Sequence, residues 1–163
     1  MKLTLTTIFI ALHFFASAHI SDTLKPYNPN ANAKADIEQA LQQAKQQNKH
    51  VLLMIGGNWC SWCIKFNKFV LKDAQLDSAL HANYILYHLN HSKENENKEL
   101  LTKYEFPQRF GFPVFVILNA EGKRIHTQNS AYLEEAKGYS KRNILEFFDH
   151  WSPRALKLES YQE

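Results

Sequence analysis

Two cysteines are the only ones in this chain of 163 residues, and they are the residues whose spacing points most directly to chemistry. Cys60 and Cys63 follow the apolar run Val51 to Ile55, which has the length of a strand buried on both faces, and they open an apolar-sided segment, Ile64 to Leu71, that predicts a helix. Because free N–H groups and the macrodipole at a helix N-terminus stabilise an anion, we expect Cys60 to ionise near or below neutral pH and to act as a nucleophile.

The spacing of the pair predicts a redox couple. Residues three apart on a helix share one face, so Cys63 can reach the sulfur of Cys60 and close a small disulfide ring. We expect Cys63 to lie one turn deeper and to be less exposed. Thiol–disulfide exchange uses this asymmetry, because an exposed thiolate attacks the substrate disulfide and a sheltered thiol then resolves the mixed disulfide. This chemistry requires no bound cofactor.

Other uses of two cysteines fit less well. A c-type haem site needs His after the second Cys, where this chain has Ile64. Zinc would want a second ligand pair, and the candidates His88 and His91 lack metal-site spacing, so we predict no metal. A structural bridge across so small a loop would add little stability. Cu(I) handling by the two thiolates stays open as an alternative.

The rest of the chain predicts one α/β domain that holds the pair in place. Helices alternate with buried strands and a hairpin and a helix follow, which implies a central mixed sheet of about four strands covered on both faces. The expected elements are a helix with Asp36 as N-cap, strand 51–55, helix 64–71, a helical turn at 76–82, strand 84–89, a brief helix 98–104, strand 113–118, a hairpin strand 123–126 and a last helix capped by Ser140.

The N-terminal sequence predicts that the protein is exported. Lys2, an apolar run and the A-x-A site Ala16 to Ala18 are typical of a secretory signal peptide over residues 1–18. An uncleaved anchor is disfavoured because the run is shorter than the about 20 apolar residues of a spanning helix. Residues 19–35, rich in Asn and Pro, are expected as an extended lead-in on the surface, and 152–163 as a tail.

The net charge of the chain disfavours two classes of binding partner. The net charge is +3 and the basic residues are scattered, which argues against nucleic acid or a polybasic membrane-binding surface. We expect a monomer that does not insert into the membrane after signal cleavage. An exported Cys pair meets an oxidising compartment, where it is either a bridge or a working redox couple.

The sequence resembles the thioredoxin superfamily. The resemblance covers Ala35 to Trp151 and rests on the run Trp59-Cys60-Ser61-Trp62-Cys63 after a buried strand and on Gly111-Phe112-Pro113 before another. It implies a three-layer α/β/α thioredoxin-like domain over 36–151, similar to bacterial exported thioredoxin-like proteins. It further implies a cis bond before Pro113, with Phe112 left free to pair with a substrate strand; Pro107 is the alternative proline.

The resemblance also has gaps. Where thioredoxins carry a buried acid this chain has Met54, and His88 occupies the place of a nearby Lys, so His88 is a candidate proton relay; the alternative is a solvated histidine at a strand end. Trp59 and Trp62 are either core aromatics or, as we favour, the rim of a substrate groove.

These features together predict a periplasmic thiol–disulfide oxidoreductase. Its substrates would be protein disulfides, and its redox partner a thiol protein, with a membrane-borne electron carrier as one candidate. We favour the reducing direction. An isomerase would normally need a dimer or a second domain. The alternative outside enzymes is a binding module that docks a partner through Trp59, Trp62 and Phe112.

Overall fold

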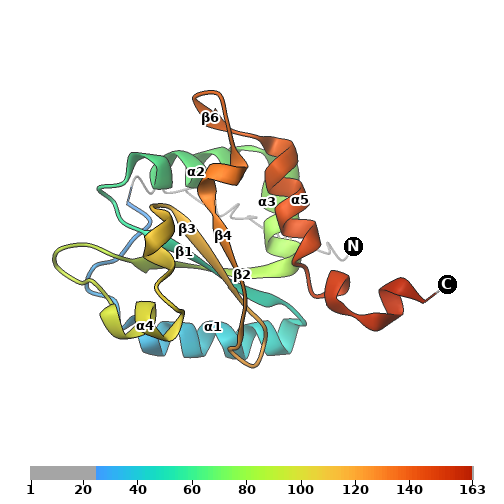
Figure 1. Cartoon of the computed structure of the whole chain (residues 1–163). Helices are drawn as coiled ribbons and strands as arrows, with labels where there is room; N and C mark the ends of the chain where they lie inside the picture. Colours follow the sequence, from blue (N-terminus) through green and yellow to red (C-terminus); the bar gives the residue numbers. More distant parts are fainter. Residues whose placement is uncertain (1–24, 163) are drawn as a thin grey trace, which may run out of the picture.

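The computed structural model describes residues 25–162 and places a four-stranded mixed sheet between two layers of helices (Figure 1). The strand order is β2-β1-β3-β4; β1 runs parallel to β2 and antiparallel to β3, and β4 is antiparallel to β3. The predicted three-layer fold with four strands is confirmed. The strands of this sheet are β1 (His50–Gly56), β2 (Tyr84–Asn90), β3 (Val114–Leu118) and β4 (Arg124–Asn129).

Alternate residues of the buried strands point to opposite faces, and each face has its own layer of helices. Leu52 and Met54 of β1 pack with α2, α3 and α5, in the cluster that also holds both cysteines; we call this side the cysteine face. Leu53 and Ile55 pack with α1 and α4 on the α1 face. The helices are α1 (Ala33–Gln47), α2 (Ser61–Lys72), α3 (Ala74–Asn83), α4 (Lys98–Lys103) and α5 (Lys141–His150).

Helix α1 begins one turn earlier than expected. Its N-cap is Asn32, whose side chain accepts a hydrogen bond from the backbone N–H of Ala35, so the assignment of Asp36 as N-cap is wrong. Asp36 lies in the first turn instead, and its carboxylate accepts a hydrogen bond from the Tyr87 hydroxyl at 3.0 Å. Asn and Asp are both favourable N-cap residues, so the residue type alone does not decide between Asn32 and Asp36. Ala33 is buried, which favours the earlier start of the helix.

Several elements after the cysteines are longer than expected or were not predicted. The helical turn expected at 76–82 is part of a longer helix, α3 (Ala74–Asn83), which Asp73 caps, and the hairpin strand expected at 123–126 continues to Asn129. A small hairpin precedes α5 and was not predicted. The additional elements are η1 (Pro107–Phe110), η2 (Ser130–Leu133), β5 (Glu134–Glu135), β6 (Gly138–Tyr139), η3 (Arg154–Leu156) and η4 (Leu158–Tyr161).

The N-terminal lead-in, which was expected to lie on the surface, is buried in part. Tyr27 is only 2% exposed and belongs to the core cluster of the cysteine face, so the expectation of a surface segment is wrong at this residue. Two hydrogen bonds hold it there: Tyr27 N–H donates to Asn58 Oδ1 at 3.2 Å, and Asn58 Nδ2 donates to the Tyr27 carbonyl at 2.7 Å. The proposed signal segment 1–18 lies outside the described residues.

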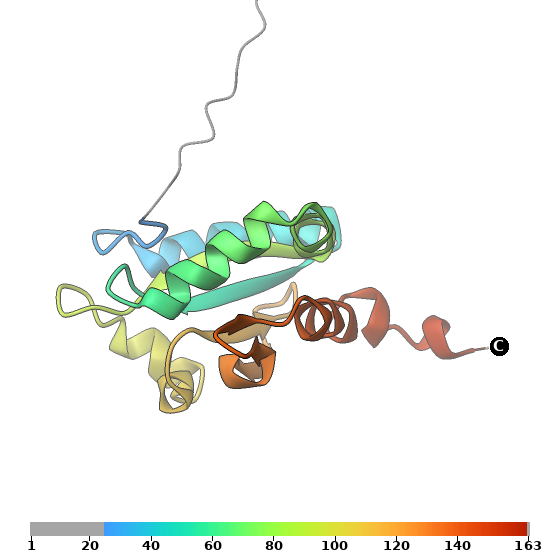
Figure 2. The same ribbon diagram turned by 90° about the horizontal axis from the view of Figure 1, so that it is seen from above.

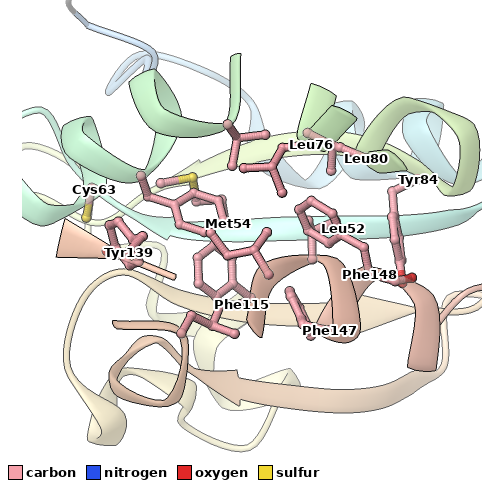
Figure 3. Packing of buried hydrophobic residues seen from close by; sticks show 14 of the residues in the cluster. Leu52, Met54, Cys63, Leu76, Leu80, Tyr84, Phe115, Tyr139, Phe147 and Phe148 are labelled. Carbon is pink, nitrogen blue, oxygen red and sulfur yellow. The ribbon is translucent and has the colours of Figure 1, made fainter. Parts of the chain in front are cut away.

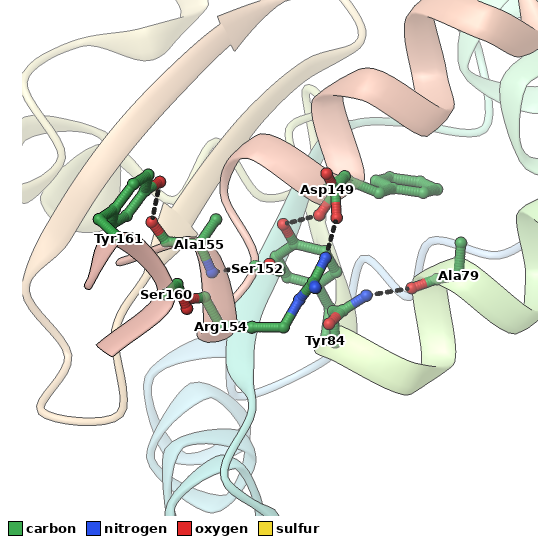
Figure 4. A network of polar contacts seen from close by, with 10 residues as sticks. Ala79, Tyr84, Asp149, Ser152, Arg154, Ala155, Ser160 and Tyr161 are labelled. Atoms are coloured by element: carbon green, nitrogen blue, oxygen red, sulfur yellow. Dashed lines mark hydrogen bonds and ion pairs between the residues drawn. The ribbon is translucent and has the colours of Figure 1, made fainter. Parts of the chain in front are cut away.

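The segment after α5 extends beyond the domain, as Figure 2 shows. Arg154 of this segment pairs with Asp149 of α5, and α5 is itself held to β2 by the Tyr84 hydroxyl, which donates to the Phe148 carbonyl at 2.8 Å (Figure 4). Tyr161 closes the segment on itself through a hydrogen bond to the carbonyl of Ala155. Within residues 25–162, no helix combines the length and the apolar content that crossing a membrane requires.

Candidate active site

The two cysteines form a disulfide at the N-terminus of α2. Strand β1 ends at Gly56, a short turn follows, and Cys60 is the N-cap of the helix. The backbone N–H of Cys63 donates to the Cys60 sulfur at 3.1 Å. A sulfur at this position therefore receives a hydrogen bond from the first turn as well as the field of the helix, and both interactions favour a thiolate when the bond is reduced.

Burial distinguishes the two sulfurs in the expected direction. Cys60 is 5% exposed and Cys63 is 0% exposed. Cys63 lies at one end of the aromatic cluster that includes Tyr139 and Phe115, with Met54 from β1 close by (Figure 3). Cys60 is thus less open in the oxidised protein than an exposed nucleophile would be, while Cys63 has no direct access to solvent.

Gly56 allows the close packing around Cys63. A Cβ atom at this position would lie 2.4 Å from the Cys63 sulfur and 3.0 Å from the Tyr27 hydroxyl oxygen, distances that a real side chain cannot adopt. A glycine is therefore needed where β1 passes behind the disulfide. The sequence assigned neither Gly56 nor Tyr27 a role at the site, because packing between segments distant in the chain leaves no local pattern.

The Phe112–Pro113 peptide bond is cis, as the resemblance implies, and the alternative residue Pro107 is not preceded by a cis bond. The antiparallel pair Ile55 and Val114 places the start of β3 beside the end of β1, so Pro113 lies next to the turn that leads to the cysteines. Phe112 precedes the first ladder residue of β3 and is partly buried.

Trp59 forms an open rim at this site. Its side chain is 59% exposed, its indole N–H donates to the His91 carbonyl at 2.8 Å, and its ring meets Phe112 edge to face at 5.4 Å between centroids. The His91 ring also stacks on the Phe112 ring, at 5.1 Å between centroids. His91 entered the sequence analysis only as an unsuitable zinc ligand, and its backbone role could not be read from its residue type.

Trp62 is held differently. Its ring packs edge to face against Tyr139 at 5.4 Å, and the Lys65 ammonium lies 4.2 Å above the ring centroid. The Tyr139 hydroxyl donates to the Trp62 carbonyl at 3.2 Å. Trp62 therefore braces the first turn of α2 against β6 and offers only part of its surface to a partner.

His88 lies within β2 and is paired with Met54, so the interpretation as a solvated histidine at a strand end is wrong. Its Nε2 donates to Asn67 Oδ1 at 2.9 Å, and its ring meets the Tyr27 ring edge to face at 5.3 Å. Burial lowers the pKa of His88 to about 4, so the imidazole is neutral at pH 7.

Two depressions flank the disulfide. One of about 490 Å³ lies beside Trp59, and the other of about 560 Å³ follows the outer side of α2. Within residues 25–162, no three His, Cys, Asp or Glu side chains gather as a set of metal ligands. The first depression is lined by Trp59, His91, Ser92, Lys93, Glu94 and Glu96, and the second by Ser61, Ile64, Lys65, Lys68, Phe69, Lys72 and Asp73.

Known proteins with similar sequences are named for disulfide exchange. A thioredoxin-like family model matches residues 32–120, which is more than half of the chain. The chain is 30% identical over 116 residues to the disulfide bond reductase DsbH of Chlamydia pneumoniae, covering 64% of this chain and 68% of that protein. It is 29% identical over 89 residues to the thiol:disulfide interchange protein DsbD of Photorhabdus laumondii, but this match spans 53% of the chain and only 15% of DsbD.

Solved structures agree with these matches. The structure of a disulphide isomerase from Xylella fastidiosa Temecula1 superposes with a TM-score of 0.67 at 28% identity, over 76% of this chain and 94% of that one. The oxidised C-terminal domain of Neisseria meningitidis DsbD has the same fold, with a TM-score of 0.54 at 18% identity, over 74% of this chain and 96% of that one. The chain belongs to the thioredoxin-like family and is a thiol–disulfide oxidoreductase of that family.

Proposed function

We propose that this protein reduces disulfides of protein substrates in the periplasm, with Cys60 as nucleophile and Cys63 as resolving thiol. One observation carries the proposal: the pair forms a disulfide in which Cys60 caps α2 and the fully buried Cys63 lies behind it. The capping position stabilises a thiolate on Cys60. The burial of Cys63 keeps external disulfides away from the second sulfur until the first has reacted.

The reaction then proceeds in two exchanges. The Cys60 thiolate attacks a substrate disulfide, forms a bond to one substrate sulfur, and releases the other as a thiolate that takes up a proton. The Cys63 thiolate next attacks the Cys60 sulfur, so that the Cys60–Cys63 bond forms and the second substrate thiolate leaves. The substrate gains two electrons and two protons, and the protein ends in the disulfide state of this structure.

The substrate would lie across Trp59, Phe112 and Pro113. Trp59 presents an exposed ring, and its contact with Phe112 joins the cysteine turn to the start of β3. Phe112 lies just outside the ladder of β3, where its backbone can pair with an extended chain. Trp62 contributes the exposed part of its ring, and the depression beside Trp59 can receive a substrate side chain.

The direction, compartment and redox partner are proposed from the similar proteins and from the N-terminal sequence. The Chlamydia relative is named a reductase, which favours the reducing direction, and the DsbD relatives are named for thiol:disulfide interchange, which favours a thiol protein as redox partner. We propose a membrane-borne electron carrier as one candidate for that partner. The A-x-A site at Ala16 to Ala18 favours export. We propose that the protein acts as a monomer. We also propose His88 as a proton relay, because its imidazole is neutral and its ring contacts the Tyr27 ring.

Cysteine variants test the two roles separately. Reduction of insulin by dithiothreitol should be accelerated by the wild type and not by Cys60→Ser or Cys63→Ser. With a substrate disulfide, Cys63→Ser should accumulate a mixed disulfide on Cys60, whereas Cys60→Ser should not. Ser61→Ala, which leaves both sulfurs in place, is the matched control and should keep its turnover.

The equilibrium potential of the pair tests the direction. Trp59 and Trp62 flank the disulfide, so their fluorescence reports its state during titration with dithiothreitol and glutathione mixtures. A value near about −270 mV would support a reductase, and one near about −120 mV would support an oxidant instead. A pair that is inert in these buffers, or turnover that is unchanged in Cys60→Ser, would contradict the redox function and favour a binding module.

A further inference from the structure

The Tyr27 hydroxyl is a buried polar group without a hydrogen-bond partner. Among residues 25–162, three side-chain atoms share this condition: the hydroxyls of Tyr27 and Tyr104 and the carbonyl oxygen of Gln108. Of these residues, only Tyr27 belongs to the core cluster that contains the cysteines, while Tyr104 packs on the α1 face. A buried hydroxyl loses its hydrogen bonds to water on folding, so an unpaired one calls for an explanation.

The hydroxyl oxygen lies in the same pocket as the sulfur of Cys63, at most 5.4 Å from it, and does not hydrogen-bond to it in the disulfide state. Both atoms border the volume that a side chain at Gly56 would fill, since one point there is 2.4 Å from the sulfur and 3.0 Å from the hydroxyl oxygen. The ring of Tyr27 is fixed by its burial, by backbone hydrogen bonds to Asn58, and by the edge contact with His88. A segment that precedes the first helix therefore holds the hydroxyl close to the sulfur, within reach of a small movement of the sulfur on reduction.

The other polar groups around Cys63 are already engaged. The Tyr139 hydroxyl donates to the Trp62 carbonyl, and His88 Nε2 donates to Asn67. Cys60 is the partner in the disulfide. Among the titratable groups that the described residues bring to this pocket, Tyr27 is thus the one with a free donor. Burial raises the pKa of Tyr27, so the hydroxyl keeps its proton in the pH range in which thiols ionise.

We propose that the Tyr27 hydroxyl donates a hydrogen bond to the sulfur of Cys63 once the disulfide is reduced, and so stabilises the thiolate that resolves the mixed disulfide. The inference rests on the proposed roles of Cys60 and Cys63. During resolution the Cys63 thiol gives up its proton, which the proposed relay His88 passes to the departing substrate thiolate or to water. The Cys63 sulfur then forms the bond to Cys60 while the bond from Cys60 to the substrate breaks. Tyr27 keeps its own proton throughout and acts on the pKa of Cys63.

The physical effect is large enough to measure. A thiolate in an apolar pocket is disfavoured by desolvation, which raises the pKa of the thiol. One hydrogen bond to a charged group opposes that effect, and a change of about tenfold in the thiolate fraction corresponds to about 1.4 kcal/mol, close to the usual worth of such a bond. In the disulfide state there is no charge to stabilise, and the hydroxyl is left unpaired.

The test compares Tyr27→Phe with Tyr104→Phe, because each variant removes one buried unpaired hydroxyl and keeps the ring. Reduced protein is oxidised in a single turnover by saturating glutathione disulfide, so that resolution by Cys63 limits the fluorescence change. At pH 7 the resolution rate of Tyr27→Phe should fall about tenfold. Its pH profile should shift upward by about one unit, and the rates should approach those of wild type in alkaline solution. Tyr104→Phe should follow the wild type.

A second readout separates this role from a structural one. In a Cys60→Ser background, the thiolate absorbance of Cys63 should titrate about one pH unit higher when Tyr27 is also Phe. The melting temperature of oxidised Tyr27→Phe should be unchanged or raised, because an unpaired hydroxyl has been removed. A pH profile and a thiolate titration that match wild type would overturn the proposal for Tyr27. If wild-type Cys60 and Cys63 did not react with glutathione disulfide at all, the proposed function itself would fail.

Discussion

The two faces of the sheet are built from alternate residues of the same strands, yet they differ in kind. The α1 face is packed mainly with aliphatic side chains from β1, β3, α1 and α4. The cysteine face holds a chain of aromatic rings in contact, from Phe66 through Phe115 to Phe147, together with the polar groups of His88 and Asn67. The reactive disulfide lies at one end of this second core.

This difference shows how the fold divides its tasks. On the α1 face a core residue contributes to stability alone, because no reactive group lies within that cluster. On the cysteine face the same residue also sets the space and polarity around a sulfur. Both faces contain a buried tyrosine hydroxyl without a partner, and only the one on the cysteine face borders a sulfur. Stability and reactivity are therefore coupled on one face and separate on the other.

Adjacent residues of β1 offer the strongest test of that separation. Leu53 and Met54 are both fully buried and point to opposite faces. Leu53→Ala and Met54→Ala should each lower the free energy of unfolding by about 2–5 kcal/mol, measured by urea denaturation. Only Met54→Ala should also speed alkylation of Cys63 in the reduced protein, since its cavity opens near the sulfur. Equal alkylation rates in the two variants would show that the faces are not separate.

Acid should weaken the cysteine face through His88. The unfolded chain takes up this proton near pH 6.5, whereas burial holds the folded pKa at about 4. The folded state therefore loses stability as pH falls through this interval, by about 3 kcal/mol once both states are protonated. Urea denaturation from pH 7 to pH 4 should show this loss in the wild type and a smaller loss in His88→Gln. His150→Gln, at the exposed end of α5, controls for removal of a histidine as such.

Substitution of Gly56 should have a smaller effect on stability, because the added side chain would collide with the disulfide. The added methyl of Gly56→Ala would lie 2.4 Å from the Cys63 sulfur, so the backbone or the helix must move. We expect a loss of about 1–3 kcal/mol in the free energy of unfolding of the oxidised protein, typical of an overpacked core. Gly138→Ala is the matched control, because its Cβ would meet its nearest neighbour at an ordinary 4.0 Å. Similar losses in both variants would show that the loss in Gly56→Ala does not come from packing at the sulfur, because the effect of Gly→Ala on unfolded-chain entropy is stabilising.

The sequence alone predicted the features that depend on neighbouring residues. The apolar run Val51 to Ile55 predicted β1, and the Cys-x-x-Cys spacing placed both sulfurs at the start of a helix, because these patterns depend on neighbours within a few residues. The position of Pro113 before a strand pointed to the cis bond only through the resemblance, since proline by itself is mostly trans.

The sequence was insufficient where distant segments meet. Tyr27 looked like part of a surface lead-in, and only the pairing of its backbone with Asn58 brings it into the core. His91 contributes a backbone carbonyl, which every residue type carries. The β5–β6 hairpin is stabilised by Tyr139 packing on Phe66, a contact across 73 positions that no local period encodes.

The smallest effect on stability is expected at the rim. Trp59 is 59% exposed, so Trp59→Ala should lower the free energy of unfolding by about 1 kcal/mol or less, since it removes only an exposed hydrogen bond to His91 and the ring contact with Phe112. Trp62→Ala should cost more, because it removes the ring contact with Tyr139 and the cation–π contact with Lys65. If Trp59 lines the substrate groove, its variant should raise the KM for insulin while the rate with small disulfides stays near that of wild type. An unchanged KM would remove Trp59 from the groove and leave substrate binding to the Phe112 backbone.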